Sequence, residues 1–182
     1  MGFYYYVYMA HPERFTNAGF EEYCRRFGLK VTLPEDFALS ETDLLFSMVV
    51  DDERFTRGWK DTTFRVNLVL DPGAGARRPY HRKPTLRDKL RKTYPVRILE
   101  AIRDKPFVWR LCGSLYGQLD NLVCCLLGGY LVTACQGVMD AQEVERFYED
   151  GPSMDREIHA ILDELLQSAK AGRLSMKPES GE

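Results

Sequence analysis

One apolar pattern constrains the fold of this chain more than any other feature. Large apolar residues recur at steps of three and four between Pro106 and Leu127. They are Val108, Leu111, Leu115, Leu119, Leu122 and Leu126. Such a repeat aligns one apolar stripe along a helix, and proline is favoured in a first helical turn. The pattern therefore predicts one long buried helix at about 106–127.

Strand and helix patterns on both sides of this segment predict a mixed fold. Aromatic and β-branched residues dominate 3–10, and further strand-like runs are 44–50, 64–70 and 130–134. Shorter helical patterns are 17–27, 85–92, 95–103 and 154–171. This order predicts an α+β fold in which a mostly antiparallel sheet of about four to five strands packs against several helices.

The length of the chain is that of one domain. It has 182 residues, of which 45% are hydrophobic and 29% are charged, close to the averages of globular proteins. Residues 1–172 are expected to form a single α+β domain. The last ten residues, 173–182, are polar and are expected to form a flexible C-terminal tail.

The cysteines and the apolar runs indicate a cytoplasmic protein. The five cysteines have no zinc-type spacing, and reduced thiols that pack as small apolar groups are typical of the cytosol. The aromatic N-terminus lacks the basic start of a signal peptide. The longest apolar run, 122–135, is shorter than the roughly 20 residues of a membrane span. We therefore expect no membrane contact, no metal and no cofactor.

Charge is strongly segregated along the chain. Residues 77–110 carry twelve Lys and Arg against three acids, a segment charge of +9. Residues 31–53 and 139–164 each have a segment charge of −7. The basic segment is interpreted first as a solvated face or as a partner of the chain's own acidic segments. An acidic protein partner, or less favourably a nucleic acid, is the alternative.

No linear motif identifies a catalytic residue. The carboxylates of 51–53 follow a strand and suit either acid–base chemistry or a soluble strand end. The glycines of 71–76 lack the Lys-Ser/Thr ending of a phosphate loop. The hypothesis that the chain is an enzyme is therefore less favoured than that of a binding domain. Its form would be a small phosphate- or nucleic-acid-handling enzyme that uses the basic 77–110 segment with Asp51, Asp52 or His81.

The second half of the chain resembles small bacterial immunity proteins of polymorphic and secreted toxin systems. The resemblance lies in the stretch 115–132, which contains Leu127-Gly128-Gly129-Tyr130, followed by Gly137-Val138-Met139-Asp140-Ala141-Gln142. The opening strand, Phe20-Glu21-Glu22-Tyr23 and the turn at 33–37 are also similar. The resemblance implies a chain without catalysis that binds a toxin domain tightly and blocks its active site.

The leading hypothesis is a non-catalytic protein-binding domain with three contact regions. These are an acidic strand end, a loop with an aromatic anchor, and the basic segment 77–92. Trp, Tyr and Arg dominate binding hot spots, and segregated charge steers association. The candidate contact residues are Asp51, Asp52, Glu53, Phe55, Arg57, Trp59, Arg77, Arg78, His81 and Arg82. A third hypothesis is a structural subunit that self-associates through Gly113 and Gly117.

Overall fold

The structure is a computed structural model that describes residues 2–31, 33, 43–49, 63–69, 83–114, 118–141 and 144–171. Its main sheet has the strand order β4-β1-β5-β6, and each neighbouring pair is antiparallel. The strands are β1 (Gly2–Met9), β4 (Phe107–Ser114), β5 (Gly137–Ala141) and β6 (Arg146–Tyr148). The predicted α+β class with an antiparallel sheet is confirmed.

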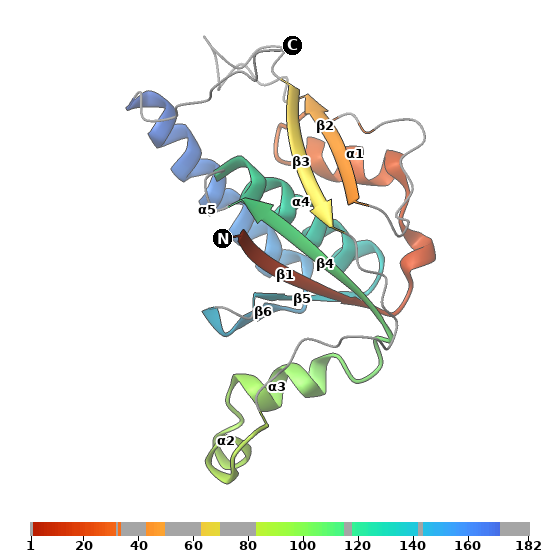
Figure 1. Cartoon of the computed structure of the whole chain (residues 1–182), viewed down its shortest axis with the longest axis vertical. Coiled ribbons are helices and arrows are strands. Elements are labelled where there is room, and N and C mark those ends of the chain that lie inside the picture. The colour runs from red at the N-terminus through yellow and green to blue at the C-terminus, as the bar shows by residue number, and fades with distance from the viewer. Residues whose placement is uncertain are drawn as a thin grey trace.

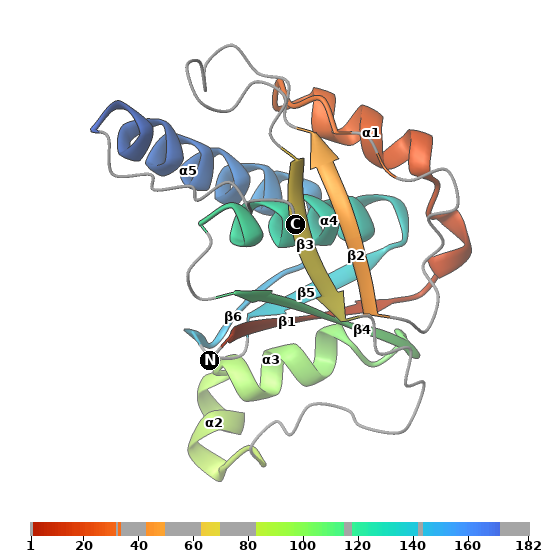
Figure 2. The same cartoon turned by 45° about the horizontal axis from the view of Figure 1, so that its top comes forward.

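Two groups of helices cover opposite faces of this sheet (Figures 1 and 2). The helices α1 (Asn17–Arg25), α4 (Gln118–Ala134) and α5 (Gly151–Lys170) cover what we call the three-helix face. Among the described residues a single helix, α3 (Tyr94–Ala101), covers the opposite face, which we call the α3 face. The short helix α2 (Leu86–Arg91) precedes α3 and forms one end of the molecule in Figure 1. A 3-10 turn, η1 (Pro12–Arg14), links β1 to α1.

A separate hairpin accounts for the two middle strands. β2 (Asp43–Val49) and β3 (Thr63–Val69) pair antiparallel in full register, from Asp43 opposite Val69 to Val49 opposite Thr63. Within the described strands the hairpin forms its own two-stranded sheet, separate from the main sheet, although β3 lies close to β4. The two strands expected at 44–50 and 64–70 are thus present, and they pair with each other.

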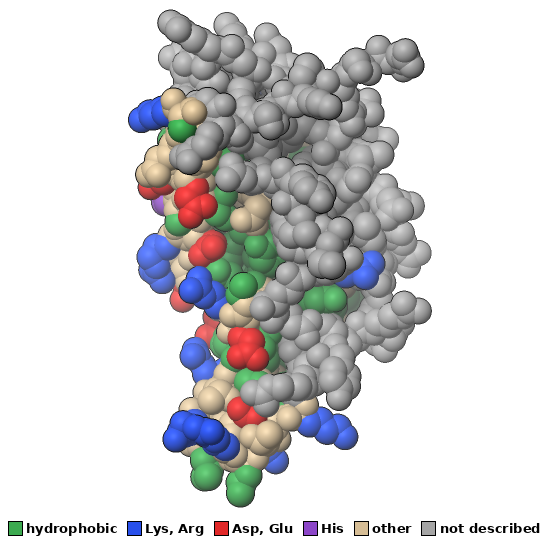
Figure 3. Space-filling view, turned by 60° about the vertical axis from the view of Figure 1, so that its left-hand side comes forward, with side chains coloured by type: hydrophobic (Ala, Val, Ile, Leu, Met, Phe, Trp, Pro, Cys, Tyr) green, Lys and Arg blue, Asp and Glu red, His purple; other side chains and the backbone are tan. Residues whose placement is uncertain are grey.

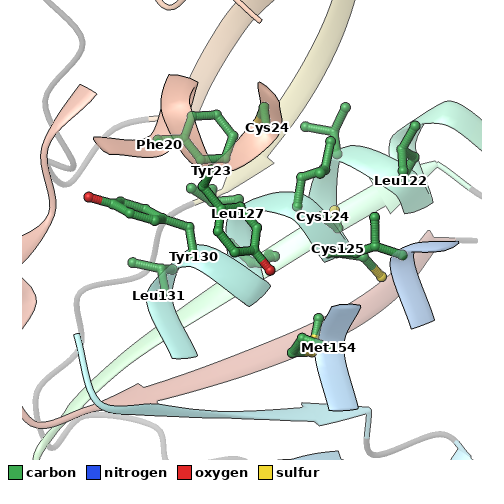
Figure 4. Close-up of a cluster of buried hydrophobic side chains, with 14 of the residues drawn as sticks. Phe20, Tyr23, Cys24, Leu122, Cys124, Cys125, Leu127, Tyr130, Leu131 and Met154 are labelled. Carbon is green, nitrogen blue, oxygen red and sulfur yellow. The ribbon is translucent and has the colours of Figure 1, made fainter. Parts of the chain in front are cut away.

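The larger core lies on the three-helix face, between the sheet and the helices α1, α4 and α5. The sheet contributes side chains such as Val7, Trp109 and Met139, which point toward the helices. Figure 4 shows how α1, α4 and α5 supply the opposing side chains. Those drawn and labelled include Phe20, Tyr23, Cys24, Leu122, Leu127, Tyr130, Leu131 and Met154. Helix α4 is the central element, since residues 122–132 are buried without interruption.

A smaller core lies on the α3 face. It consists of Ile98 and Ile102 from the α3 region packed on Tyr8, Val108 and Val138 of the sheet. Successive residues of a strand point to opposite faces, so β1 contributes Val7 and Met9 to one core and Tyr8 to the other. The sheet is apolar on both faces, which hides the alternation that usually marks a strand.

The predicted long helix at 106–127 is wrong at both ends. Residues 107–114 form strand β4, and the helix is α4 at Gln118–Ala134. The step of three from Val108 to Leu111 is coincidental, because Val108 packs on the α3 face and Leu111 on the three-helix face. The aromatic and β-branched run Phe107-Val108-Trp109 was the competing signal, and it is typical of strands.

The strand expected at 130–134 is also wrong, because α4 continues through it. Gly128 and Gly129, which directly follow the predicted helix end at 127, lie in the interior of α4. A Cβ at Gly128 would overlap the Met139 side chain, and one at Gly129 would overlap Tyr23 Oη. These glycines therefore allow close packing of α4 on β5 and α1.

The structure tests the remaining expectations only in part. No helix among the described residues has the length and apolar character needed to cross a bilayer. The boundary of the single domain at 172 stays a prediction, and the tail 173–182 lies outside the described residues. Gly113, half of the proposed self-association face, lies on β4 and not on a helix, and Gly117 is outside the described residues.

Candidate functional site

All ten contact residues expected from the sequence lie outside the described residues. They are Asp51, Asp52, Glu53, Phe55, Arg57, Trp59, Arg77, Arg78, His81 and Arg82. The structure does describe residues 83–92, the end of the basic segment 77–92. We call residues 83–92 the basic tip, and this is the part of the expected contact regions whose geometry can be analysed.

The basic tip is built around one buried carboxylate. Asp88 is 7% exposed and closes a capping box with Thr85, the residue that precedes α2. Its Oδ2 accepts hydrogen bonds from Thr85 N at 2.8 Å and from Thr85 Oγ1 at 2.7 Å. Its backbone N donates in return to Thr85 Oγ1 at 3.2 Å. A six-residue helix is marginal by itself in water, so these bonds hold its first turn.

The same carboxylate fixes the end of α2. Thr93 Oγ1 donates to Asp88 Oδ1 at 2.7 Å, and Thr93 N donates to Asp88 O at 3.2 Å. Lys92 adopts a left-handed conformation with φ of 45°, which turns the chain directly from α2 into α3. Both ends of α2 are therefore fastened by polar contacts on its inner side.

The outer side of α2 carries two exposed leucines. Leu86 is 74% exposed and Leu90 is 78% exposed, and their spacing of four places them on one face of the helix. The usual amphipathic arrangement is thus inverted, because the carboxylate of Asp88 is buried and the leucines face solvent. Figure 3 shows apolar side chains protruding at this end of the molecule, beside Lys and Arg side chains.

Five cations surround the two leucines. Lys83, Arg87, Lys89, Arg91 and Lys92 are all exposed, and Asp88 is the one acid in the basic tip. Within the described part of the chain, none of the five cations forms an ion pair. This part of the basic segment is therefore not neutralised by the acidic segments that the structure describes.

Helix α3 anchors the basic tip to the sheet through one buried polar contact. Tyr94, the first residue of α3, donates from Oη to Asp140 Oδ1 of β5 at 2.5 Å. Asp140 is 0% exposed, and burial raises its pKa to about 6, although the bond from Tyr94 opposes this shift. The pKa of Tyr94 is raised by burial and then by its bond to Asp140.

Asp140 is a carboxyl group with an unusual pKa, but its position does not suit catalysis. Perturbed carboxyl groups are candidates for acid–base roles only when substrate can reach them. Asp140 is fully enclosed, while Tyr6 of β1 and Phe147 of β6 lie opposite it in the sheet. Its hydrogen bond with Tyr94 instead joins α3 to the sheet.

The cysteines also lack the features of a nucleophile. Cys24, Cys124, Cys125 and Cys135 are buried free thiols. Burial raises the pKa of Cys125 to about 12 and that of Cys135 to about 11, and it raises the pKa of Cys24 as well. The interpretation of the cysteines as small core residues is confirmed for these four. The side chain of His11 contacts Glu13 at 3.0 Å.

The described surface also contains a shallow pocket near the start of β5. Its volume is about 360 Å³, and its lining residues are Ala101, Lys105, Val132, Gln136, Gly137, Val138 and Glu149. Lys105 Nζ pairs with Asp104 at 2.9 Å, so the cation of this pocket is already engaged. Among the described residues no three His, Cys, Asp or Glu are grouped to hold a metal. The basic tip is therefore the stronger candidate site.

Comparisons with protein families, curated proteins and solved structures found no relative of this chain. No family model matches the chain, and neither a curated protein nor a solved structure matches it significantly.

The signal for this site was present in the sequence but incomplete. The basic segment 77–92 was named as a contact region, yet Leu86 and Leu90 were not among the candidate residues. Leucines four apart in a helical pattern ordinarily indicate a buried face. Only the inward position of Asp88 reveals that this face points outward.

Proposed function

We propose that this chain is a non-catalytic protein-binding domain and that α2 is its described contact element. The observation that carries the proposal is the exposure of Leu86 and Leu90, at 74% and 78%, on a helix whose polar contacts hold them outward. Exposed apolar groups with a charged rim are typical of protein interaction sites. A helix fixed in advance also loses little conformational entropy when it binds.

The particular form that we propose is an immunity protein that neutralises a bacterial toxin. Its support is the resemblance of the second half of the chain, from 115 to 142, to such proteins. An inhibitor of this kind needs a rigid scaffold and a contact surface, and it needs no chemistry of its own. The partner would then be the catalytic domain of the toxin.

The competing function is a phosphate- or nucleic-acid-handling protein that uses the basic segment 77–110. The five exposed cations of the basic tip favour it. The two leucines do not, because contacts with phosphates draw on cations and hydrogen-bond donors. Binding to nucleic acid would depend on the cations alone and would be insensitive to the leucines.

Truncation of the two leucines tests the proposal. The partner is captured from a nuclease-treated lysate of the native source, and its affinity for the Leu86→Ala/Leu90→Ala variant is measured. We expect binding weakened by about 150-fold or more, since two buried leucines at about 1.5 kcal/mol each contribute about 3 kcal/mol together. The matched control is Leu99→Ala, an exposed leucine of α3 that lies outside α2. Equal affinity of the double variant and the control would overturn the proposal.

A further inference from the structure

We infer that the partner presents an acidic surface with an apolar groove, into which Leu86 and Leu90 insert. This inference rests on the proposed function and specifies the chemistry of the protein that is bound. It follows from the arrangement of apolar and charged groups on α2, considered in three steps.

The first step concerns the shape of the contact. Leu86 and Leu90 are separated by one helical turn and project from the same face of α2. Peptide helices that bind in grooves use apolar anchors at this spacing. Because α2 stands at the end of the molecule, a concave partner surface can enclose it (Figure 1). A flat surface would leave part of both side chains in water.

The second step concerns charge. Lys83, Arg87, Lys89, Arg91 and Lys92 form a rim of exposed cations on both sides of the leucines, and none of them is paired within the described residues. A basic partner surface would be repelled, and a neutral one would leave these charges without compensation. An acidic rim on the partner is complementary to all five and accelerates association.

The third step separates a protein from other anionic targets. The binding of an amphipathic helix to a lipid surface scales with the apolar area that it buries, and α2 offers only two leucines on six residues. Nucleic acid satisfies the cations but leaves the leucines without a function. A groove in an acidic protein accounts for both features of the basic tip.

The test combines cross-linking with matched charge variants. The photoreactive residue p-benzoylphenylalanine replaces Leu90 in the full chain, the lysate of the native source is irradiated, and the cross-linked partner peptide is sequenced. Affinity for that partner is then measured for Arg87→Gln/Lys89→Gln/Arg91→Gln at 50 and 500 mM salt. The control, Arg14→Gln/Arg156→Gln/Lys170→Gln, removes three exposed cations elsewhere and changes the net charge equally.

We expect an apolar cross-linked peptide flanked by Asp and Glu, together with about tenfold weaker binding of the α2 charge variant. The control triple variant should bind within about twofold of the parent chain. Salt should weaken the parent about tenfold and the α2 charge variant much less.

Other outcomes separate this inference from the proposed function. If the leucine variant loses binding while the α2 charge variant and salt have no effect, the groove is not acidic and only this inference fails. If neither set of variants affects binding, both fail. Binding of a 20-base-pair DNA duplex or of phosphatidylserine vesicles in place of protein would also overturn both. A leucine-dependent dimer in sedimentation would identify a second copy as the occupant and contradict the inference.

Discussion

The two faces of the main sheet are stabilised in different ways. On the three-helix face, α1, α4 and α5 enclose a large core, and residues 122–132 of α4 are buried throughout. On the α3 face, the described part of the chain places α3 and its C-cap residue Ile102, which pack through Ile98 and Ile102, and Tyr94 donates a hydrogen bond to Asp140. We infer that the large core stabilises the fold as a whole, whereas the small core positions the exposed helix α2.

The largest contrast is expected from core truncations on the two faces. Leu126→Ala should lower the free energy of unfolding by about 3–5 kcal/mol, since Leu126 is fully buried in the large core. Ile98→Ala should lower it by about 2 kcal/mol, at the low end of the range for a buried isoleucine, because the small core has few members that can relax into the vacated space. Urea denaturation measures both values. Equal losses would show that the two cores are equally close-packed.

Hydrogen exchange sharpens this comparison. In Ile98→Ala the amides of α2 and α3 should exchange faster while those of α4 keep their protection, because the small core opens locally. The matched control is Leu99→Ala on the same helix, at a side chain that is 40% exposed, and it should change neither region. Loss of protection throughout the molecule would contradict the separate roles of the faces.

The next largest effect is expected at Asp140, as a dependence of stability on pH. Its folded pKa of about 6 lies above the ordinary value of 3.8, so the folded state binds the proton more tightly than the unfolded chain. This contribution to stability is complete below about pH 4 and is lost as pH rises through 6. A shift of roughly two units corresponds to about 3 kcal/mol.

The substitution Asp140→Asn measures this contribution. Asparagine can still accept the bond from Tyr94 but cannot ionise, so the variant should gain about 3 kcal/mol relative to the parent between pH 4 and pH 7.5. Asp150→Asn is a control at an exposed carboxylate. The bond from Ser153 N lowers the pKa of Asp150, so its proton is lost at lower pH and that variant should show almost no change in stability relative to the parent between pH 4 and pH 7.5. An unchanged difference for Asp140→Asn across this range would show that Asp140 is not buried as described.

A smaller loss is expected from Gly129→Ala in α4. Alanine is intrinsically favoured over glycine in a helix by about 1 kcal/mol. The added Cβ would overlap Tyr23 Oη and lie 3.2 Å from Ile158 Cδ1, so the packing of α1 and α5 must shift. We expect a net destabilisation of about 1–2 kcal/mol in thermal unfolding. Thr133→Ala, at an exposed position of the same helix, should be neutral or slightly stabilising, and a stabilised Gly129→Ala variant would contradict the tight contact.

The smallest effect is expected from Thr85→Ala, which removes the cap of α2. The free energy that holds α2 helical should fall by about 1 kcal/mol, while the rest of the fold is unaffected because α3 has its own contacts with the sheet. Thr85→Ser retains the capping hydroxyl and should restore amide protection in α2. If Thr85→Ala leaves exchange in α2 unchanged, the capping box does not hold the basic tip.

The sequence was sufficient to predict local elements but not their faces. The helical pattern at 17–27 predicted α1, which ends at Arg25 and is followed by a turn to Gly28 at φ of 73°. The segment 107–134 failed because its strand is apolar on both faces and its helix contains two glycines that usually signal a stop. Both errors arise from tertiary packing, namely burial of β4 on two sides and the close approach of Met139 and Tyr23 to α4.

The positive charge of the candidate site could be predicted from the sequence, but the exposure of its two leucines could not. The basic segment was visible as twelve cations, whereas the direction of Leu86 and Leu90 depends on the partners of Asp88. The expected contacts at Trp59 and its neighbours stay predictions, since those residues lie outside the described part of the chain.

The most direct test of the account is a hydrogen–deuterium exchange footprint of the full chain with and without its captured protein partner. The account predicts that binding slows exchange in 83–92, at the basic tip, and leaves the amides of α1, α4 and α5 unchanged. Protection on the surfaces of α1 and α5, with exchange in 83–92 unaffected, would show that the contact element lies elsewhere and would contradict the account.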